Sequence, residues 1–228
     1  MAELRFFFGT MGSGKSTQAL QIRHNLAARG LNVILTTQLD RQVGKVSSRL
    51  GVEAEAEIVD AKVNLFELAR MAFEKSGLDA MVCDEAQFYE PKQIEQLSQV
   101  VDELHVDVYA FGLLTSFQGE LFPGTARLLE LADVRSQVQV EARCWCGSRA
   151  THNARLVNGV QVYSGALKVV GDTTDEGTEE TVEVTYELMC RKHWHLGLRR
   201  RQGEQLELLD QQTEPAEIIN LPLKTPSP

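Results

Sequence analysis

The stretch FFFGTMGSGKSTQAL, residues 6–20, decides the fold. An apolar run leads into a glycine-rich turn, and Lys15 follows the turn with two hydroxyl side chains directly after it. The pattern G-x-x-x-x-G-K-[ST] is typical of a loop, placed between a buried strand and a helix, whose backbone N–H groups surround a phosphate. The helix adds the positive end of its dipole. The segment therefore predicts an α/β fold that binds a nucleoside polyphosphate.

The residue types in this loop suggest individual roles. Glycines let the backbone wrap round the phosphates, Lys15 would neutralise the β- and γ-phosphates, and the Ser16 hydroxyl would bind Mg²⁺. A chance glycine-rich turn is the alternative, but the strand before it and the helix after it are what the motif requires. We expect the nucleotide-binding residues to be Gly9, Thr10, Met11, Gly12, Ser13, Gly14, Lys15, Ser16 and Thr17.

An acidic pair, Asp84 and Glu85, follows the apolar run AMVC. We expect Asp84 to hold Mg²⁺ directly or through water. Neighbours in an extended segment point to opposite faces, so the two carboxylates cannot face the metal in the same way. Glu85 is then free to take a proton from an attacking hydroxyl, or to position water as in an ordinary ATPase. These segments alone leave both roles open.

Strand-like and helix-like patterns alternate up to about residue 140. This alternation indicates a parallel sheet covered by helices on both faces. We expect strands at 4–8, 32–37, 56–59, 79–83, 107–113 and 136–140, and helices at 18–28, 65–73, 91–104 and 125–131.

Composition excludes some classes of function. The chain has 228 residues and a net charge of −9, which disfavours a non-specific nucleic-acid binder with a basic face. No apolar stretch approaches the roughly 20 residues of a membrane helix, and the N-terminus has no pattern of a signal peptide. We therefore expect a cytoplasmic protein that uses neither nucleic acid nor a membrane as its partner.

Three of the four cysteines belong to two short ligand-like pairs. Cys144 and Cys146 form the first pair, and Cys190 and His193 form the second. In a reducing compartment such clusters predict metal ligands before disulfides. Three thiolates and one imidazole suit a closed, tetrahedral structural Zn²⁺ site. The alternative is reduced thiols beside a surface histidine.

Five segments now combine in order: GTMGSGKST from Gly9, DEAQFY from Asp84, GLLTSFQGELFPG from Gly112, CWCG from Cys144 and YELMCRKH from Tyr186. With this order and spacing, the chain resembles the zinc-containing thymidine kinases, in their bacterial form. The resemblance covers roughly residues 4–195.

The resemblance implies a RecA-like P-loop α/β domain over residues 1–141. A small zinc-binding domain would follow at 142–195, with a loop called the lasso that closes over the nucleoside. A C-terminal helix and loosely held tail would occupy 196–228. Members transfer the γ-phosphoryl of ATP to the 5′-hydroxyl of thymidine for deoxynucleotide salvage. The resemblance also implies a homotetramer.

Residue roles carry over by motif. The resemblance makes Glu85 the general base, Asp84 the residue associated with Mg²⁺, and Gln87 part of the nucleotide site. Phe117 matches the aromatic that stacks on thymine, and Tyr186 a tyrosine near the substrate. The lasso backbone that holds the base matches Leu167, Lys168, Val169, Val170 and Gly171, and a nucleotide-proximal loop matches Asp40 and Arg41.

Two departures from the family pattern stand out. The acidic stretch GDTTDEGTEETVE, from Gly171, is longer than usual, and Leu114 replaces a basic residue of some bacterial members. Two alternatives to a thymidine kinase are considered. One is a related kinase for another deoxynucleoside, and the other is a P-loop ATPase whose zinc module binds nucleic acid or protein.

Overall fold

The computed structural model describes residues 1–38, 45–47, 51, 53–138, 141–167 and 183–197. Its backbone divides into two compact units, Met1–Leu198 and Arg199–Pro228. The second unit lies outside the described residues, as do the nucleotide-proximal loop expected at Asp40 and Arg41 and most of the expected C-terminal helix and tail.

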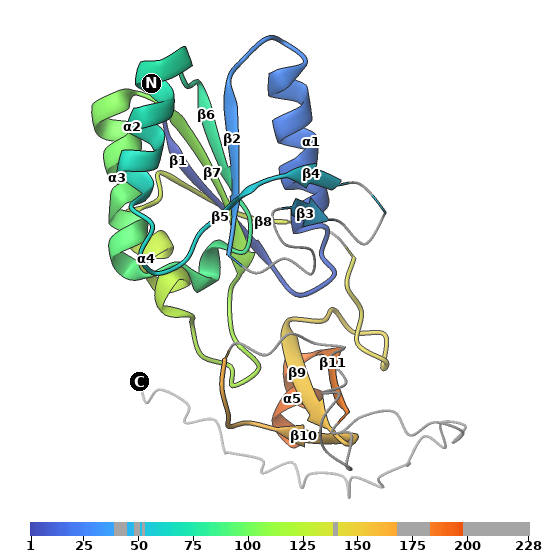
Figure 1. Cartoon of the computed structure of the whole chain (residues 1–228). Coiled ribbons are helices and arrows are strands. Elements are labelled where there is room, and N and C mark those ends of the chain that lie inside the picture. The colour runs from blue at the N-terminus through green and yellow to red at the C-terminus, as the bar shows by residue number, and fades with distance from the viewer. Residues whose placement is uncertain (39–44, 48–50, 52, 139–140, 168–182, 198–228) are drawn as a thin grey trace, which may run out of the picture. The chain divides into compact units, whose positions relative to one another are not determined.

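A six-stranded parallel sheet forms the first part of the chain (Figure 1). The strand order is β5-β2-β6-β7-β1-β8, and each neighbouring pair is parallel. Its strands are β1 (Leu4–Gly9), β2 (Val33–Thr37), β5 (Glu57–Ile58), β6 (Ala80–Cys83), β7 (Asp107–Leu113) and β8 (Val134–Gln137). This arrangement is the expected α/β fold.

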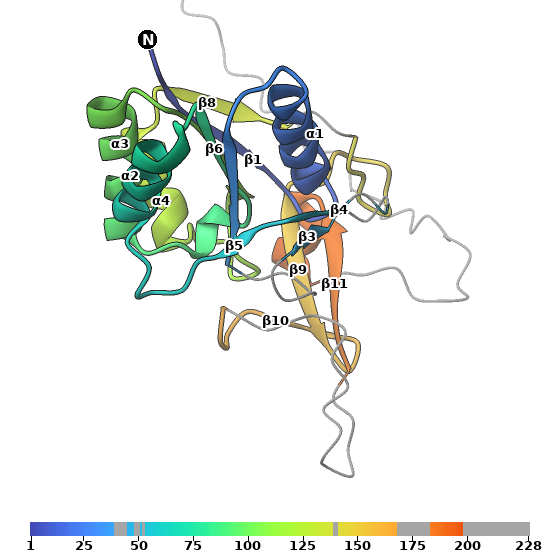
Figure 2. The same ribbon diagram turned by 45° about the horizontal axis from the view of Figure 1, so that its top comes forward.

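Helices cover both faces of the sheet (Figures 1 and 2). One face packs against α2 (Leu65–Ser76), α3 (Pro91–Leu104) and α4 (Pro123–Leu131), and the other against α1 (Lys15–Ala27). Successive strand residues point to opposite faces. Thus Phe6 and Cys83 join the first core, while Val82 and Phe111 join the second.

Most expected elements are confirmed with shifted ends. The helix at 91–104 and the strand at 107–113 have the expected bounds, whereas α1 starts three residues earlier than expected, at Lys15. The strand expected at 136–140 overlaps β8, Val134–Gln137, and residues 139–140 of that expectation lie outside the described residues. The structure also contains a hairpin of β3 (Lys45–Ser47) and β4 (Glu53–Glu55), for which the sequence analysis predicted no strands.

The cysteine-histidine part of the chain forms its own small sheet. The strands β9 (His152–Val157), β10 (Val160–Val162) and β11 (Val184–Met189) pair antiparallel in the order β10-β9-β11. A six-residue helix, α5 (Arg191–Leu196), follows β11. We call residues 142–167 and 183–197 the cysteine-histidine unit.

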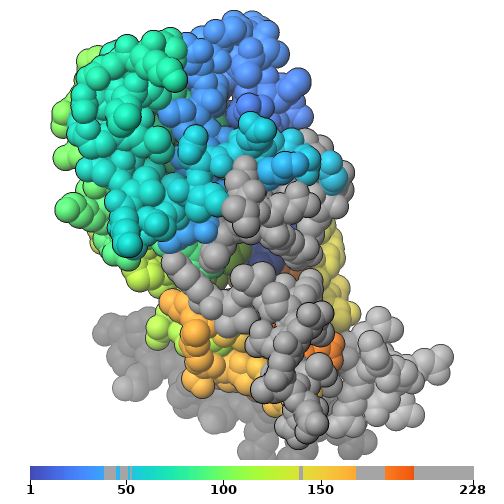
Figure 3. All heavy atoms as spheres, viewed as in Figure 1, coloured from blue at the N-terminus to red at the C-terminus, as the bar shows by residue number. Residues whose placement is uncertain are grey.

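In the space-filling view, orange residues of this unit adjoin yellow-green residues that follow β7 (Figure 3). Hydrogen bonds join the same two regions, from Gln118 Nε2 to the Gly165 carbonyl and from Trp194 Nε1 to the Phe117 carbonyl. Among the described residues, no helix is long and apolar enough to cross a membrane.

Candidate active site

The phosphate loop connects β1 to α1 at the carboxyl end of the sheet. Gly14, directly before α1, has φ +80°, a left-handed conformation that suits glycine. A Cβ atom at Gly9 would lie 2.4 Å from the Ser13 hydroxyl oxygen. The glycines therefore permit the tight turn that the motif indicated.

Lys15 is buried inside this loop and 7% exposed. Its ammonium Nζ donates to the Thr10 carbonyl at 2.8 Å, so the side chain folds back over the loop. The Met11 N–H donates at 2.8 Å to Asn153 Oδ1, which belongs to β9 of the cysteine-histidine unit. The phosphate loop is thus tied to that unit by its own backbone.

Asp84 follows β6, whose neighbour β7 lies next to β1 in the sheet. The carboxyl ends of adjacent parallel strands meet at one edge, so Asp84 lies beside the phosphate loop. Burial, and secondarily the Glu85 carboxylate, raises the pKa of Asp84 to about 7 from its ordinary value of 3.8, although a hydrogen bond with Ser16 opposes the rise.

The Asp84 carboxylate has the features of a cation ligand. Its Oδ1 atom is buried and has no hydrogen-bond partner among the described residues. A divalent cation would supply the missing partner, and hydroxyl and carboxylate oxygens are ligands that Mg²⁺ accepts. The Ser16 and Asp84 side chains therefore fit a Mg²⁺ ion.

Glu85 adopts a left-handed backbone conformation, with φ 54°, at the start of the 3-10 helix η1 (Ala86–Phe88). Non-glycine residues with this conformation are uncommon and are concentrated at functional sites. Asp84 is buried at 3% exposure, whereas Glu85 is half-buried. The two carboxylates therefore occupy different environments.

Gln87 is almost fully buried, and both ends of its amide are engaged. Nε2 donates to Glu85 Oε2 at 2.5 Å, and Oε1 accepts the Leu113 N–H at 3.0 Å. A Cβ atom at Gly112 would lie 2.8 Å from Gln87 Oε1, so β7 approaches this amide closely. Gln87 therefore orients the Glu85 carboxylate from a position in η1 that its hydrogen bond to β7 fixes.

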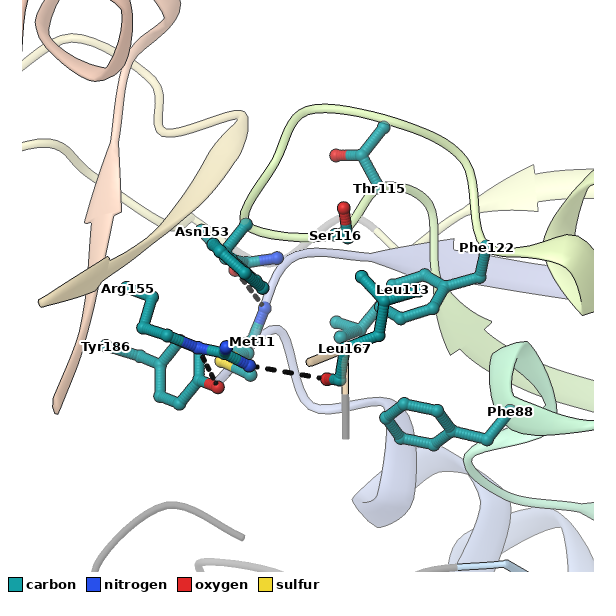
Figure 4. Close-up of a pocket in the computed structure, with 11 residues that line it drawn as sticks. Met11, Phe88, Leu113, Thr115, Ser116, Phe122, Asn153, Arg155, Leu167 and Tyr186 are labelled. Carbon is teal, nitrogen blue, oxygen red and sulfur yellow. Dashed lines mark hydrogen bonds between the residues drawn. The ribbon is translucent and has the colours of Figure 1, made fainter. Parts of the chain in front are cut away.

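A pocket lies next to the phosphate loop (Figure 4). Met11 belongs to both, so the pocket continues from the loop. Most of the other lining side chains are apolar or aromatic, with a few polar groups among them, as in many small-molecule sites. They are Phe88, Leu113, Thr115, Ser116, Phe117, Phe122, Asn153, Arg155, Leu167 and Tyr186.

Arg155 organises one wall of this pocket and is 4% exposed. Its guanidinium carbon lies 3.7 Å from the centre of the Phe117 ring. Nε donates to the Tyr186 hydroxyl at 2.8 Å, and one terminal nitrogen donates to the Leu167 carbonyl at 3.4 Å (Figure 4). The other terminal nitrogen donates to the Ala166 carbonyl at 2.7 Å. Because Arg155 covers one face of Phe117, a stacked base has only the opposite face unless Arg155 moves.

The structure thus brings together Phe117, Tyr186 and Leu167, three of the residues expected at the nucleoside. Lys168, Val169, Val170 and Gly171, the rest of the expected lasso backbone, lie outside the described residues.

Sequence reasoning missed Asn153 and Arg155. Both lie in β9, two residues apart, so they face the same side of the strand. Two polar residues at alternate positions of a short strand were the available signal.

The four expected metal ligands lie together in the cysteine-histidine unit, with their ligand atoms within 4.8 Å of one another. Cys144 Sγ and Cys190 Sγ lie 3.3 and 3.5 Å from His193 Nδ1, and Cys146 Sγ lies 4.0 Å from Cys190 Sγ. Zinc–ligand bonds are about 2.0–2.3 Å long, so two ligand atoms of a tetrahedral site are separated by roughly the distances found between these sulfur and nitrogen atoms. Hydrogen bonds from Ser148 lower the pKa of Cys146 to about 7, which favours the thiolate that binds metal.

Comparisons with known proteins agree with this geometry. The sequence profile of the family described as "Thymidine kinase" matches residues 2–194. A Streptomyces coelicolor protein named thymidine kinase is 52% identical over 195 residues, which cover 85% of this chain and 88% of that protein. One from Cutibacterium acnes is 44% identical, with 87% and 90% covered, and one from Ruegeria pomeroyi is 40% identical, with 85% and 94% covered. The chain therefore belongs to the thymidine kinase family.

Proposed function

We propose that this protein transfers the γ-phosphoryl group of ATP to the 5′-hydroxyl of thymidine and so produces thymidine monophosphate. The observation that carries the proposal is the continuity of the phosphate loop with an aromatic pocket through Met11. A nucleoside in the pocket would present its hydroxyl toward the end of a polyphosphate in the loop. Glu85, at the carboxyl end of β6, is the carboxylate available to that hydroxyl.

Each residue near the phosphates has a role in the proposal. The backbone of Gly9 to Thr17 and the Lys15 ammonium hold the triphosphate and neutralise its charge. Ser16 and Asp84 would hold Mg²⁺, which would supply positive charge to neutralise the phosphates. Gln87 serves the nucleotide site indirectly, because its amide orients Glu85.

Glu85 acts as the general base. Its carboxylate takes the proton of the 5′-hydroxyl as the oxygen attacks the γ-phosphorus, and ADP leaves. Phe117 provides an aromatic face for the thymine ring, and Tyr186 and Leu167 complete the wall beside Arg155. The backbone of Lys168 to Gly171 is proposed to hold the edge of the base.

We also propose a structural Zn²⁺ bound by Cys144, Cys146, Cys190 and His193. The ligand atoms form a closed set of four and belong to segments far apart in the sequence, so the ion would fasten the start of the cysteine-histidine unit to α5. Metal analysis of protein purified without chelator is expected to find about one zinc per chain. A folded, active preparation without zinc would contradict this assignment.

The family resemblance further supports three proposals about organisation. They are a P-loop domain at 1–141, a zinc-binding lasso domain at 142–195 and a C-terminal region at 196–228. A cytoplasmic homotetramer that acts on thymidine and ATP, without nucleic acid or membrane, completes the proposal.

A panel of nucleosides with Mg·ATP tests the function. We expect phosphorylation of thymidine with a higher kcat/KM than for deoxyuridine, deoxycytidine or purine deoxynucleosides. Preference for another nucleoside would indicate the related-kinase alternative. ATP turnover that responds to DNA but not to any nucleoside would contradict the kinase assignment altogether.

A further inference from the structure

Trp194 lies next to the metal-ligand candidate His193 in α5, yet its indole reaches the loop that carries Phe117. Nε1 donates to the Phe117 carbonyl at 3.1 Å, across 77 residues of sequence. The Phe117 ring itself is buried at 4% exposure, with Arg155 on one face. Phe117 is therefore fixed twice by the cysteine-histidine unit, at its ring by Arg155 and at its backbone by Trp194.

The loop is shaped to receive the indole. Gly119, two residues after Phe117, has φ +81°, and a Cβ atom there would lie 2.5 Å from Trp194 Cη2. The Gly119 N–H donates to the Ser116 carbonyl at 3.1 Å, and the Ser116 N–H to the Glu120 carbonyl at 2.8 Å. The Phe117 carbonyl is thus presented from a tight turn whose glycine lies against the tryptophan ring.

Trp194 is in turn held from its own side. Its ring stacks on His152 with centroids 4.7 Å apart and meets the Tyr163 ring edge-on at 5.4 Å. Its carbonyl accepts hydrogen bonds from the Tyr163 hydroxyl at 2.5 Å and from Gln161 Nε2 at 3.0 Å. The indole therefore has one well-defined position from which it can fix the loop.

We propose that Trp194 is a positioning residue that holds Phe117 in place to stack on the nucleoside base. The inference rests on the proposed function, because it takes Phe117 to be part of the thymidine site. Trp194 acts only through Phe117. Its loss should therefore weaken thymidine binding while the phosphate loop, Glu85 and Mg·ATP are unaffected.

The test compares Trp194→Phe with Tyr163→Phe in the full-length, metal-loaded protein. Trp194→Phe keeps an aromatic ring for His152 but removes the N–H donor, whereas Tyr163→Phe removes a hydrogen bond to the Trp194 carbonyl and leaves the indole in place. Calorimetry with thymidine and with a non-hydrolysable ATP analogue, steady-state kcat and zinc content are measured for each.

We expect Trp194→Phe to weaken thymidine binding by about three- to tenfold, the range for one lost hydrogen bond. ATP affinity, kcat at saturating thymidine and zinc content should stay at wild-type levels. Tyr163→Phe removes one support of Trp194 but keeps the indole N–H, so it should weaken thymidine binding less than Trp194→Phe does. Unchanged thymidine affinity in Trp194→Phe would overturn the proposal. So would an equal loss of ATP affinity or a loss of zinc, because either would indicate general damage to the fold.

Gly119→Ala tests the contact between Trp194 and the Phe117 loop by a change in the loop. Its added Cβ collides with Trp194, so the variant should also weaken thymidine binding. Combined with Trp194→Phe, its effect should be smaller than in wild type, because the colliding Cη2 atom is gone, while the strain from φ +81° is common to both backgrounds. If the fold-changes of the two single variants in thymidine dissociation constant simply multiplied in the double variant, the proposed contact would be contradicted.

The same experiment separates the two proposals. If wild-type protein did not bind thymidine, or if Phe117→Ala bound it normally, the proposed site itself would fail. If Phe117→Ala lost affinity while Trp194→Phe did not, only the role of Trp194 would fail.

Discussion

The phosphate end and the nucleoside end of the site are assembled in different ways. The phosphate end comes from two short continuous segments, residues 9–17 and 84–87, each at the carboxyl end of a strand of one sheet. The nucleoside end combines Phe117 with Arg155, Tyr186 and Trp194. Arg155 and Tyr186 are 31 residues apart, and Phe117 and Trp194 are 77 apart. Backbone conformation thus builds one end, and long-range contacts build the other.

This difference predicts how the two ends fail. A change at the phosphate end removes a charge or a proton acceptor that acts in the transition state, so it should lower kcat. A change at the nucleoside end loosens a binding surface, so it should mainly lower thymidine affinity. The variants below test that division.

The largest effect is expected for Glu85→Gln. The amide cannot take the 5′-hydroxyl proton, so kcat should fall by about 10²–10⁴-fold. The new side-chain oxygen can still accept the hydrogen bond from Gln87, so thymidine and ATP dissociation constants should change little. Steady-state kinetics provides kcat, and calorimetry provides the dissociation constants of thymidine and ATP. A variant that kept its kcat but bound both substrates more weakly would show Glu85 to be structural.

Lys15→Ala should follow, with a loss of roughly 10²–10³-fold in kcat, typical of removing one donor that stabilises transition-state charge. Circular dichroism should show a normal fold, because Lys15 is the first residue of α1 and belongs to neither of the two core clusters of the large sheet. Lys62→Ala is the matched control, since Lys62 is exposed outside the site and its loss should change nothing. Near-normal turnover of folded, saturated Lys15→Ala would exclude the assigned role.

Phe117→Ala should affect the other end. Loss of the stacking face should weaken thymidine binding by about 1–3 kcal/mol, while Mg·ATP binding stays close to wild type. Phe73→Ala removes an exposed phenylalanine from α2 and serves as control. Unchanged thymidine affinity in Phe117→Ala would remove the main support for a base-stacking role.

The same contrast explains what the sequence could predict. The phosphate loop, the strand before Asp84 and the helix at 91–104 follow from local patterns: glycines at a turn, a buried apolar run and a proline at the first helical position. Their residues are neighbours in sequence, so spacing alone was informative.

The sequence contains weaker signals for the contacts made by the three-stranded sheet of the cysteine-histidine unit. Arg155 is a buried cation whose partners are a ring, a hydroxyl and two carbonyls from three other segments. None of those partners can be inferred from the motif HNARLV alone. The β3–β4 hairpin was also missed, because its strands are three residues each and mostly polar. Such elements form through pairing with a partner rather than through their own propensity.

The smallest effect concerns stability and again separates the two ends. Arg155 is buried with hydrogen-bond partners, whereas buried Asp84 has an unpartnered oxygen and a pKa raised to about 7. Without ligand, desolvation of the buried Asp84 carboxylate should therefore destabilise the folded protein at the phosphate end. Asp84→Asn removes the charge at nearly constant shape, so it should stabilise the protein measured without ATP, Mg²⁺ or thymidine.

The sign of the pH dependence follows from the two pKa values. Below about pH 4 the carboxyl group is protonated in both folded and unfolded chains. Between about pH 4 and 7 the unfolded chain releases the proton and the folded chain keeps it, so the Asp84 contribution lowers the free energy of unfolding as pH rises. In urea unfolding, the free energy of unfolding of Asp84→Asn should therefore rise relative to that of wild type between about pH 4 and 7, by about 1 kcal/mol or more.

Two further measurements test whether Asp84 causes this pH dependence of stability. Glu85→Gln removes the secondary cause of the raised pKa and leaves burial, the main cause, so it should keep most of the pH dependence. Saturating Mg·ATP should reverse the ranking, because wild type gains a ligand for the buried carboxylate and Asp84→Asn does not. If the stability difference between Asp84→Asn and wild type were constant from pH 4 to 8, Asp84 would titrate normally. The phosphate end would then carry no such destabilisation, and the contrast between the two ends would reduce to how far apart their residues lie in the sequence.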